Sequence, residues 1–258
     1  MEATTALDLL RKSFENFISG ETAVSVAYSG GLDSSIVAAV AKGFAEVRCY
    51  ACVVRGSFDA RNAKGRAEAE SLDLVIVELT AEGIAPIVRE TAEVLGTSNP
   101  MQLAYTIPIL TVLKESRERL MLAGNGADEL FGGYARYASV RNPTKMMAED
   151  LDKMLREGDR LRKAATAMGR RIEFPFVSDE LVEFSRSLPL NRKISTSQRK
   201  VLLREVAKLL DLPSQNLPKK AAQYSSGVLK EMERLAKADG KSLAEWTRSL
   251  TESRGRSS

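Results

Sequence analysis

The 258-residue sequence contains no histidine, two cysteines and one tryptophan. The absence of histidine excludes histidine general bases, histidine metal ligands and Ser-His-Asp triads, so any catalysis depends on other side chains, the backbone or a metal ion. No apolar run is long enough to span a bilayer, and residues 1–20 mix charges throughout, unlike a signal peptide. We therefore expect a cytoplasmic protein with no membrane association.

The sequence also lacks an excess of charge of either sign. Its 38 basic and 34 acidic residues are dispersed along the chain, and the formal net charge is only +4. This balance is weak evidence for a nucleic-acid-binding surface, so we do not expect nucleic acid as a partner. With 44% hydrophobic residues, the chain has ample material for a buried core.

The two cysteines, Cys49 and Cys52, have the C-x-x-C spacing of redox and zinc sites. They fall within residues 47–54, which have the composition of a β-strand. Because residues three apart on a strand point to opposite faces, the two thiols should not converge. We expect both cysteines to be buried and structural.

The most distinctive segment is a glycine turn between an apolar stretch at 23–28 and an Ala-rich stretch at 36–41. Its residues are Ser29, Gly30, Gly31, Leu32, Asp33, Ser34 and Ser35. The glycines permit positive φ and a close approach of backbone to ligand. The serines offer hydroxyls and free N–H groups at a helix N-terminus, which favours an anion such as phosphate. The spacing differs from that of the G-x-x-x-x-G-K-[ST] loop, and no lysine follows the glycines.

Asp33 indicates the kind of phosphate ligand. A carboxylate beside a polyphosphate is repulsive unless a cation lies between them, and Mg²⁺ typically uses one or two carboxylates together with phosphate oxygens. The segment therefore predicts Mg²⁺ with a triphosphate or pyrophosphate. The alternative is a glycine turn followed by an Asp-capped helix, with no ligand.

Strand and helix patterns alternate through the first part of the chain. Strands are predicted at 23–28, 47–54, 74–79 and 120–123, and helices at 36–42, from Asp59 onward, from Thr80 to Gly96, and at 103–118. Such alternation predicts a doubly wound α/β fold with a parallel sheet and with ligands at the carboxyl ends of the strands. Later segments at 145–157, 179–188, 198–212 and 227–237 are helical in pattern. We divide the chain into an ATP-binding core at 1–141 and a helical part of the same domain at 142–258.

A second glycine-rich segment follows the predicted strand at 120–123. Residues 123–134 read A-G-N-G-A-D-E-L-F-G-G-Y, which places Asp128 at a strand end where it can lie opposite Asp33. Two carboxylates from two strand ends can share one or two Mg²⁺ ions over a polyphosphate. Taken alone, the segment also fits a glycine turn with solvated acids.

Together these motifs resemble those of a known family. The first segment is similar to the signature of the PP-loop ATP pyrophosphatase superfamily. The second resembles the G-E-G-[AS]-D-E-x-F-G-G-Y loop in the synthetase domain of asparagine synthetases, a family that includes β-lactam and carbapenam synthetases. Weaker similarities continue at 160–176, 181–189, 200–204 and 219–227. The resemblance implies a PP-loop sheet of the adenine nucleotide alpha hydrolase-like type, with a helical C-terminal half.

The activity implied by the resemblance is that of an ATP-dependent, AMP-forming amide ligase. In such enzymes a carboxylate attacks the α-phosphate of ATP, giving an acyl-adenylate and Mg-pyrophosphate, and ammonia or an amine then displaces AMP. The implied cofactors are ATP and Mg²⁺. Residues 29–35 would hold pyrophosphate, and Asp33 and Asp128 would hold Mg²⁺. The strand-end backbone near Val53 and Gly124 would contact the adenosine.

The resemblance also implies a set of catalytic lysines. Charge on the leaving pyrophosphate would be neutralised by Lys200 and by Lys219 or Lys220. The family's loop lysine matches only with a one-residue shift, because Ala221 stands in its place.

Other departures concern the half of the site that binds the acyl substrate. The family's first loop acid, a proposed general base, is Asn125 here, and the segment 102–108 is apolar and has no arginine. Arg171 and Glu173 stand in exchanged order before the P-F pair. The sequence begins Met1-Glu2-Ala3, with no cysteine at position 2, so we expect no glutaminase domain.

The expected partners are therefore a small carboxylate, aspartate or another acid, and ammonia. The ammonia would come free or from a separate glutamine amidotransferase subunit, and a homodimer is a further option. Two alternatives to a ligase stay open. One is a nucleotide-binding regulatory or partner subunit without acyl transfer, suggested by Asn125. The other is a tRNA-modifying PP-loop enzyme, supported only by the fold and the excess of basic residues.

Overall fold

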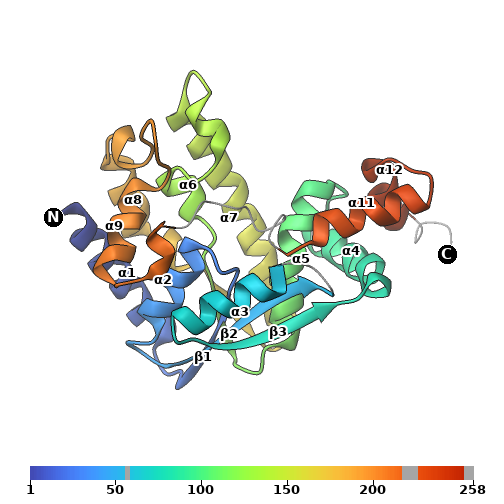
Figure 1. Ribbon diagram of the computed structural model, residues 1–258, viewed down its shortest axis with the longest axis horizontal. Coiled ribbons are helices and arrows are strands. Elements are labelled where there is room, and N and C mark those ends of the chain that lie inside the picture. The colour runs from blue at the N-terminus through green and yellow to red at the C-terminus, as the bar shows by residue number, and fades with distance from the viewer. Residues whose placement is uncertain (56–58, 217–225, 253–258) are drawn as a thin grey trace.

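The core of the structure is one parallel β-sheet. The computed structural model describes residues 1–55, 59–216 and 226–252 (Figure 1). Its five strands lie in the order β3-β2-β1-β4-β5, and every neighbouring pair is parallel. They are β1 (Ala23–Ala27), β2 (Glu46–Val54), β3 (Asp73–Leu79), β4 (Leu120–Ala123) and β5 (Arg171–Glu173). The predicted α/β class is confirmed.

Helices connect and cover these strands. The first six are α1 (Glu2–Ile18), α2 (Leu32–Ala41), α3 (Asp59–Ala69), α4 (Ala81–Leu95), α5 (Pro100–Glu115) and the short α6 (Ala127–Phe131). Those of the later part are α7 (Pro143–Ala167), α8 (Asp179–Ser187), α9 (Val201–Leu209), α11 (Val228–Ala238) and α12 (Leu243–Glu252). Within the described ranges, no helix is both long and apolar enough to cross a membrane.

Local sequence signals set the ends of α4 and α5. The Thr80 side chain accepts a hydrogen bond from the N–H of Gly83, and Gly96 ends α4 in the left-handed conformation, as predicted. The predicted start of the next helix at 103 is wrong. Asn99 caps α5 by accepting from two backbone N–H groups, so the helix begins at Pro100, and Pro108 lies inside it.

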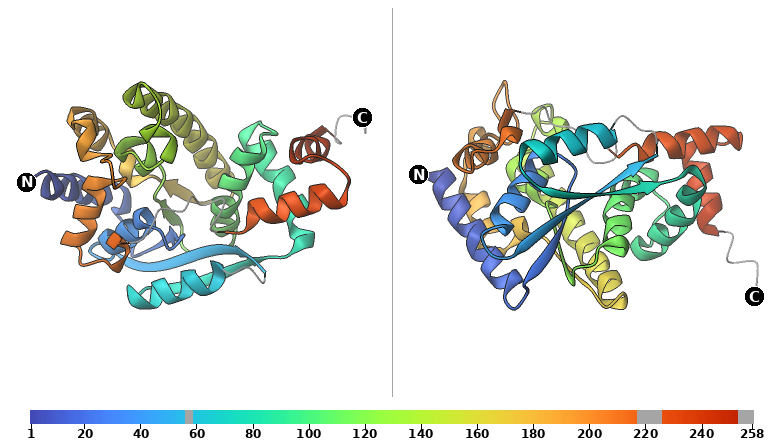
Figure 2. Two further views of the ribbon diagram at one scale, coloured as in Figure 1. Left: turned by 45° about the horizontal axis from the view of Figure 1, so that its top comes forward. Right: turned by 60° about the horizontal axis from the view of Figure 1, so that its bottom comes forward.

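The sheet separates two hydrophobic clusters, one on each face. Helices α1, α2 and α9 cover one face with buried side chains that include Phe14 and Leu202. Helices α4, α5 and α11 cover the other face with Leu103 and Met232 among their buried side chains. Figure 1 shows the first group on the left and the second on the right, and Figure 2 gives two further views of these layers.

The cysteines follow this division. Cys49 belongs to the first cluster and Cys52 to the second, and both are buried free thiols. Burial raises the pKa of each thiol to about 12, which keeps both protonated at neutral pH. The prediction of two structural cysteines on opposite faces is confirmed.

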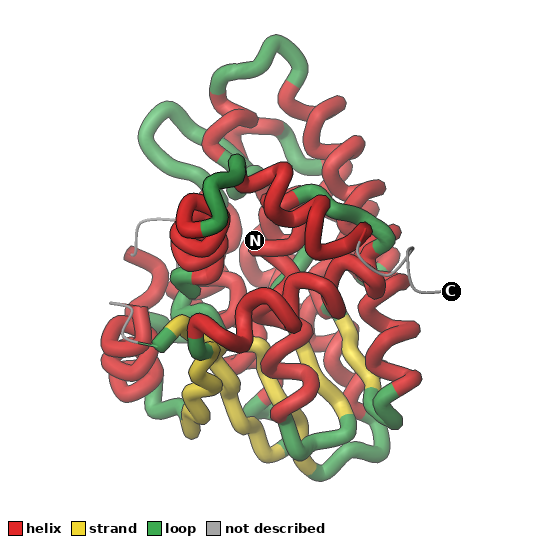
Figure 3. The backbone as a smooth tube through the Cα atoms, turned by 90° about the vertical axis from the view of Figure 1, so that its right-hand side faces the viewer, coloured by secondary structure: helices red, strands yellow, loops and turns green. Residues whose placement is uncertain are grey.

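Strand β5 is the main feature that the sequence patterns missed. Residues 171–173 pair in parallel with β4, so the part of the chain predicted to be wholly helical also contributes an edge strand. Glu173 lies 3.2 Å from Arg162 of α7, Arg171 lies 3.6 Å from Glu21, and the two exchanged residues also pair with each other at 3.9 Å. Figure 3 shows the strands side by side in the lower part of the view.

Two predicted helices have different lengths in the structure. Helix α7 continues to Ala167, well past the predicted end at 157. The helix predicted at 198–212 is shorter, because α9 begins only after Lys200, whose φ of 57° lies in the left-handed region.

The packing of β4 generates a stability prediction. Leu122 is fully buried and its strand pairs with both β1 and β5, so Leu122→Ala should lower the free energy of unfolding by about 2–5 kcal/mol. The same change at Leu209, which is 54% exposed, should alter it by less than about 0.5 kcal/mol. Urea unfolding of both variants measures the difference, and equal losses would contradict the assigned core.

Candidate functional site

The candidate site lies at the carboxyl ends of β1 and β4. These strands are neighbours in the sheet, but the chain leaves β1 toward β2 on one side and leaves β4 toward β5 on the other. Such a switch in direction opens a crevice at the strand ends, where ligands bind in open α/β sheets. Two glycine loops enter this crevice, one leading into α2 and the other into α6.

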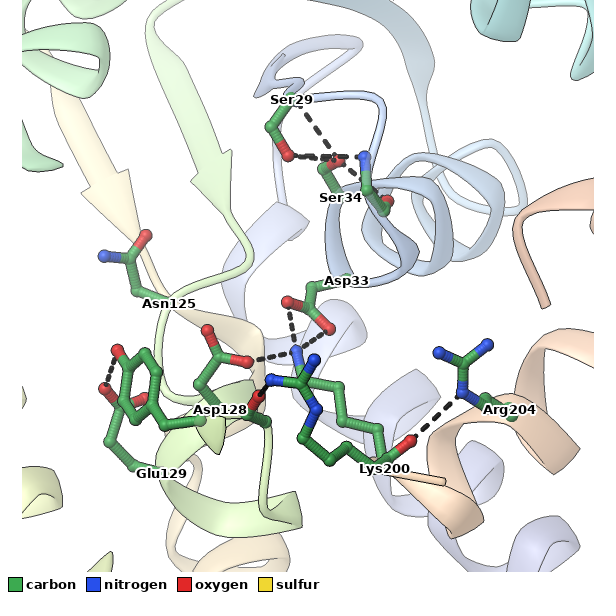
Figure 4. A network of polar contacts seen from close by, with 12 residues as sticks. Ser29, Asp33, Ser34, Asn125, Asp128, Glu129, Lys200 and Arg204 are labelled. Carbon is green, nitrogen blue, oxygen red and sulfur yellow. Dashed lines mark hydrogen bonds and ion pairs between the residues drawn. The ribbon is translucent and has the colours of Figure 1, made fainter. Parts of the chain in front are cut away.

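Hydrogen bonds between its own side chains and backbone hold the first loop closed. The hydroxyl of Ser34 accepts from the N–H of Ser29 at 3.2 Å and donates to the carbonyl of Gly31 at 3.1 Å. Gly30 has a φ of 67°, which a residue with a Cβ rarely adopts. Figure 4 shows Ser29 and Ser34 facing each other above Asp33.

Not every residue of the predicted phosphate loop faces the same cavity. Ser29, Asp33 and Ser34 line the main cavity of the site. Ser35 instead lines a separate depression with Lys42 and Glu70. A ligand in the main cavity would therefore meet the first serine of the Ser34-Ser35 pair and not the second.

The second loop packs directly against the first. A Cβ on Gly124 would lie 3.0 Å from the Cβ of Asp33 and 3.3 Å from the backbone nitrogen of Ser34. At Gly133 an added Cβ would lie 1.7 Å from Oδ1 of Asp128. Glycine at these two positions is therefore what allows the two acidic side chains to come together.

A buried lysine lies between the two acids. The ammonium of Lys200 forms ion pairs with the carboxylates of both Asp33 and Asp128, and Lys200 is only 2% exposed (Figure 4). Burial disfavours the charged form, but the two carboxylates outweigh burial and raise the pKa of Lys200 above its ordinary value. The structure thus brings together three of the residues singled out from the sequence.

Lys200 reaches the acids from an unusual backbone conformation. It is one of few non-glycine residues with positive φ, which L-residues with a Cβ disfavour. Neighbouring arginines hold the bend: Arg199 donates to the carbonyl of Gly133 at 2.9 Å, and Arg204 donates to the carbonyl of Arg199 at 3.0 Å. The bend therefore attaches the start of α9 to the second glycine loop.

Glu129 forms a second acidic group at the site. It is 5% exposed, and its Oε1 accepts a hydrogen bond from the hydroxyl of Tyr134 at 2.8 Å. Burial, and then the charge of Asp128, raise the pKa of Glu129 to about 7. Sequence reasoning did not name Glu129 or Tyr134 as site residues, although both belong to the second motif.

Asn125 stands at the position of the family's loop acid and has a defined partner. Its Nδ2 donates to the hydroxyl of Tyr105 at 2.8 Å. Burial, followed by the charges of nearby acids that include Glu129, raises the pKa of Tyr105 well above its ordinary value. Tyr105 belongs to the segment 102–108, so this segment does reach the site, through a phenol and not through an arginine.

The main cavity has an apolar part and a polar part. The apolar part lies between β1, β2 and α5, and its lining includes Ala27, Tyr50, Ala51, Cys52, Val53, Pro108, Ile109 and Val112. The polar part includes Ser29, Asp33, Ser34, Arg66, Gly124, Asn125, Asp128, Glu129 and Tyr134. Val53 and Gly124, the two positions expected near adenosine, therefore line one cavity together with the phosphate loop.

The donor set of the site can be compared with the needs of a metal ion. Among the described residues, no group of three or more His, Cys, Asp or Glu side chains could hold a metal. Asp33 and Asp128 both reach one ammonium, so they also lie within reach of one common cation. Two carboxylates fit Mg²⁺ that arrives with phosphate oxygens. Lys219, Lys220 and Ala221 lie outside the described residues.

These features define an α/β protein of the PP-loop type, with a phosphate-loop geometry and an acidic pair at the switch point of its sheet. The family model for asparagine synthase matches residues 5–149 and 138–255. The chain therefore belongs to the asparagine synthase family.

Curated relatives agree with this assignment. Putative asparagine synthetase [glutamine-hydrolyzing] 1 of Methanocaldococcus jannaschii is 30% identical over 283 residues, covering 93% of this chain and 52% of that protein. Asparagine synthetase B [glutamine-hydrolyzing] of Escherichia coli is 23% identical over 243 residues, covering 85% and 44%. Asparagine synthetase [glutamine-hydrolyzing] of Asparagus officinalis is 25% identical, covering 85% and 42%. The chain spans about half the length of these relatives.

The ion pairs of Lys200 generate a prediction about cation binding. Lys200→Met removes the ammonium that pairs with both Asp33 and Asp128, so the free energy of unfolding should fall by about 3–5 kcal/mol. Added Mg²⁺ should stabilise this variant more than the wild type, because it can replace the lost charge. Urea unfolding with and without Mg²⁺ measures both effects.

A second buried lysine provides the control. Lys193 is 7% exposed and has no ion pair among the described residues, and burial lowers its pKa to about 8. Because folding disfavours its charged form at neutral pH, Lys193→Met should leave stability unchanged or raise it. Equal behaviour of the two variants would contradict the role of the Lys200 ion pairs.

Gly133 generates a separate prediction about close packing. In Gly133→Ala the new Cβ collides with Asp128 and would also lie 2.5 Å from Cε of Lys200, so affinity for Mg-ATP should fall at least about tenfold. Gly65→Ala in α3 has no atom within 4 Å of the new Cβ and should keep wild-type affinity. Calorimetric titration with Mg-ATP compares the two, and wild-type affinity in Gly133→Ala would contradict this geometry.

Proposed function

We propose that this chain is the synthetase part of an ATP-dependent amide-forming ligase. It adenylates aspartate or another small carboxylate, releases pyrophosphate, and transfers the acyl group to ammonia or an amine with release of AMP. The observation that carries the proposal is that Asp33 and Asp128 both form ion pairs with the ammonium of Lys200, beside the phosphate loop. The names of the relatives, all asparagine synthetases, support the same reaction class.

The two parts of the cavity suit the two parts of ATP. Adenosine binds in the apolar part, where Val53 and the carboxyl-terminal parts of β1 and β2 offer backbone groups and apolar contacts. The phosphates extend toward the N–H groups and hydroxyls at the start of α2, where the helix dipole favours negative charge. This orientation places the phosphates next to the acidic pair.

Asp33 and Asp128 hold the Mg²⁺ that accompanies ATP. When bound, Mg²⁺ supplies positive charge that offsets the negative charge of the phosphates and the acids. Lys200, whose ammonium contacts both acids, is placed to transfer its contact to the leaving pyrophosphate. Lys219 or Lys220 adds charge to the same leaving group.

The chemistry has two steps. An oxygen of the substrate carboxylate forms a bond to the α-phosphorus of ATP, and the bond from that phosphorus to the bridging oxygen breaks, releasing pyrophosphate. A nitrogen nucleophile then bonds to the acyl carbon and loses a proton to water, and the bond from that carbon to the AMP oxygen breaks, releasing AMP. The protein contributes alignment and charge to both steps.

Because residue 125 is an asparagine, this position of the loop supplies no general base for the second step. An amide cannot accept the proton of the nucleophile, and its Nδ2 is already engaged with Tyr105. The nitrogen arrives as free ammonia or from a separate glutamine amidotransferase subunit. The relatives are named as glutamine-hydrolysing, and this chain spans about half of their length.

Asn125 also supports one alternative function. An ATP-binding subunit without acyl transfer would also need the phosphate loop and the acidic pair, and it would tolerate Asn125. The tRNA-modifying alternative has less support, because thiolating members need converging cysteines and Cys49 and Cys52 belong to different clusters.

The proposal predicts ATP turnover that depends on the acidic pair. The wild type should catalyse exchange of pyrophosphate into ATP with aspartate or with pooled cell metabolites, and should release AMP when ammonium is added. Asp128→Asn should lower the exchange rate at least about 100-fold, because a Mg²⁺ contact is lost. The control Asp73→Asn changes an exposed acid paired with Arg48 at the start of β3 and should keep full activity.

Three outcomes separate the functions. Exchange with aspartate indicates an asparagine-forming ligase, and exchange only with the metabolite pool indicates a ligase for another acid. ATP binding without exchange under either condition would contradict a ligase and favour the nucleotide-binding subunit.

A further inference from the structure

Helix α3 brings one arginine onto the phosphate loop. Arg66 Nη1 donates a hydrogen bond to the carbonyl of Gly30 at 2.5 Å. A Cβ on Gly30 would lie 3.1 Å from Cδ of Arg66 and 3.7 Å from Cα of Ala63. The loop and α3 are therefore in van der Waals contact, and glycine at position 30 leaves room for the arginine side chain as well as for the positive φ.

The charge balance of the cavity makes Arg66 unusual. Three acids line the polar part of the cavity: Asp33, Asp128 and Glu129. Across the described residues, Arg66 is the only lysine or arginine in that lining. Lys200 is buried behind the acids and is engaged by two of them. A polyphosphate entering the cavity would otherwise meet mainly negative charge.

The guanidinium of Arg66 retains binding capacity for a ligand. Within the part of the chain that the structure describes, it has one hydrogen bond, to Gly30, and no ion pair. An arginine has five N–H donors in a planar fork, so one hydrogen bond leaves most of them available for a ligand. This fork matches phosphate oxygens in a bidentate manner, which a lysine ammonium cannot do.

We propose that Arg66 contacts the β- and γ-phosphates of ATP and stabilises the leaving pyrophosphate. The inference rests on the proposed function, because it assumes ATP in the main cavity. The contact to Gly30 fixes the guanidinium before the nucleotide binds.

The experiment compares nucleotides that differ in their phosphates. Isothermal titration of the full chain with Mg-ATP, Mg-pyrophosphate and adenosine gives three affinities for each variant. In Arg66→Gln, affinity for ATP and pyrophosphate should fall about 10- to 100-fold, the range for hydrogen bonds to charged groups, and adenosine affinity should not change. Arg66→Lys should give an intermediate loss. Lys64→Gln, an exposed residue of the same helix, is the matched control and should bind all three like the wild type.

A second readout separates contact with phosphate from support of the loop. Phenylglyoxal, which modifies accessible arginines, should label Arg66 in the free protein, and pyrophosphate but not adenosine should protect it. Unchanged ATP affinity in Arg66→Gln, or an equal loss for adenosine, would overturn the inference. Labelling that pyrophosphate leaves unchanged would overturn it as well.

The outcomes also distinguish this inference from the proposed function. A wild type that binds ATP but forms no AMP would contradict the ligase, and Arg66 would still be tested by binding alone. A wild type that binds neither ATP nor pyrophosphate would overturn both.

Discussion

The ion pairs of one buried ammonium position the whole site. A lysine as enclosed as Lys200 costs several kcal/mol to bury unless anions compensate its charge, and two carboxylates held this close repel each other without a cation. Lys200, Asp33 and Asp128 therefore stabilise one another, and removing any one of them breaks at least one of these ion pairs. Because Asp33 lies in the first turn of α2 and Asp128 in the first turn of α6, their ion pairs fix both glycine loops relative to the sheet. A site that holds one cation between two acids has the arrangement that the proposed Mg²⁺ position requires.

This constraint links the two parts of the chain. The division at 141 and 142 stays a prediction, but the later part contributes β5 to the sheet and Lys200 to the site. Arg199 reinforces the link through its hydrogen bond to Gly133. The geometry of the two glycine loops therefore depends on residues far along the chain.

Local patterns predicted much of this structure, and long-range contacts account for most of what was missed. The first four strands, the cap at Thr80 and the opposed cysteines follow from periodicity and turn chemistry, which act over a few residues. Strand β5 has three residues, too few for a periodic signal. The contact of Lys200 with Asp33 spans 167 positions, so the motif indicated a catalytic lysine but not its carboxylate partners.

Ser35 faces away from the cavity because successive helical residues are rotated by about 100°. Arg66 sits in a helix rich in charged residues, where nothing in the pattern distinguishes a ligand from a solvated side chain.

The central claim is that the cation position between Asp33 and Asp128 becomes a metal site when nucleotide binds. A crystal structure of the complex with Mg²⁺ and a non-hydrolysable ATP analogue tests it most directly. The account predicts Mg²⁺ in contact with both carboxylates and with phosphate oxygens, adenosine beside Val53, and the ammonium of Lys200 moved onto a phosphate. Nucleotide bound elsewhere, or Lys200 still held between the acids with no metal beside them, would contradict it.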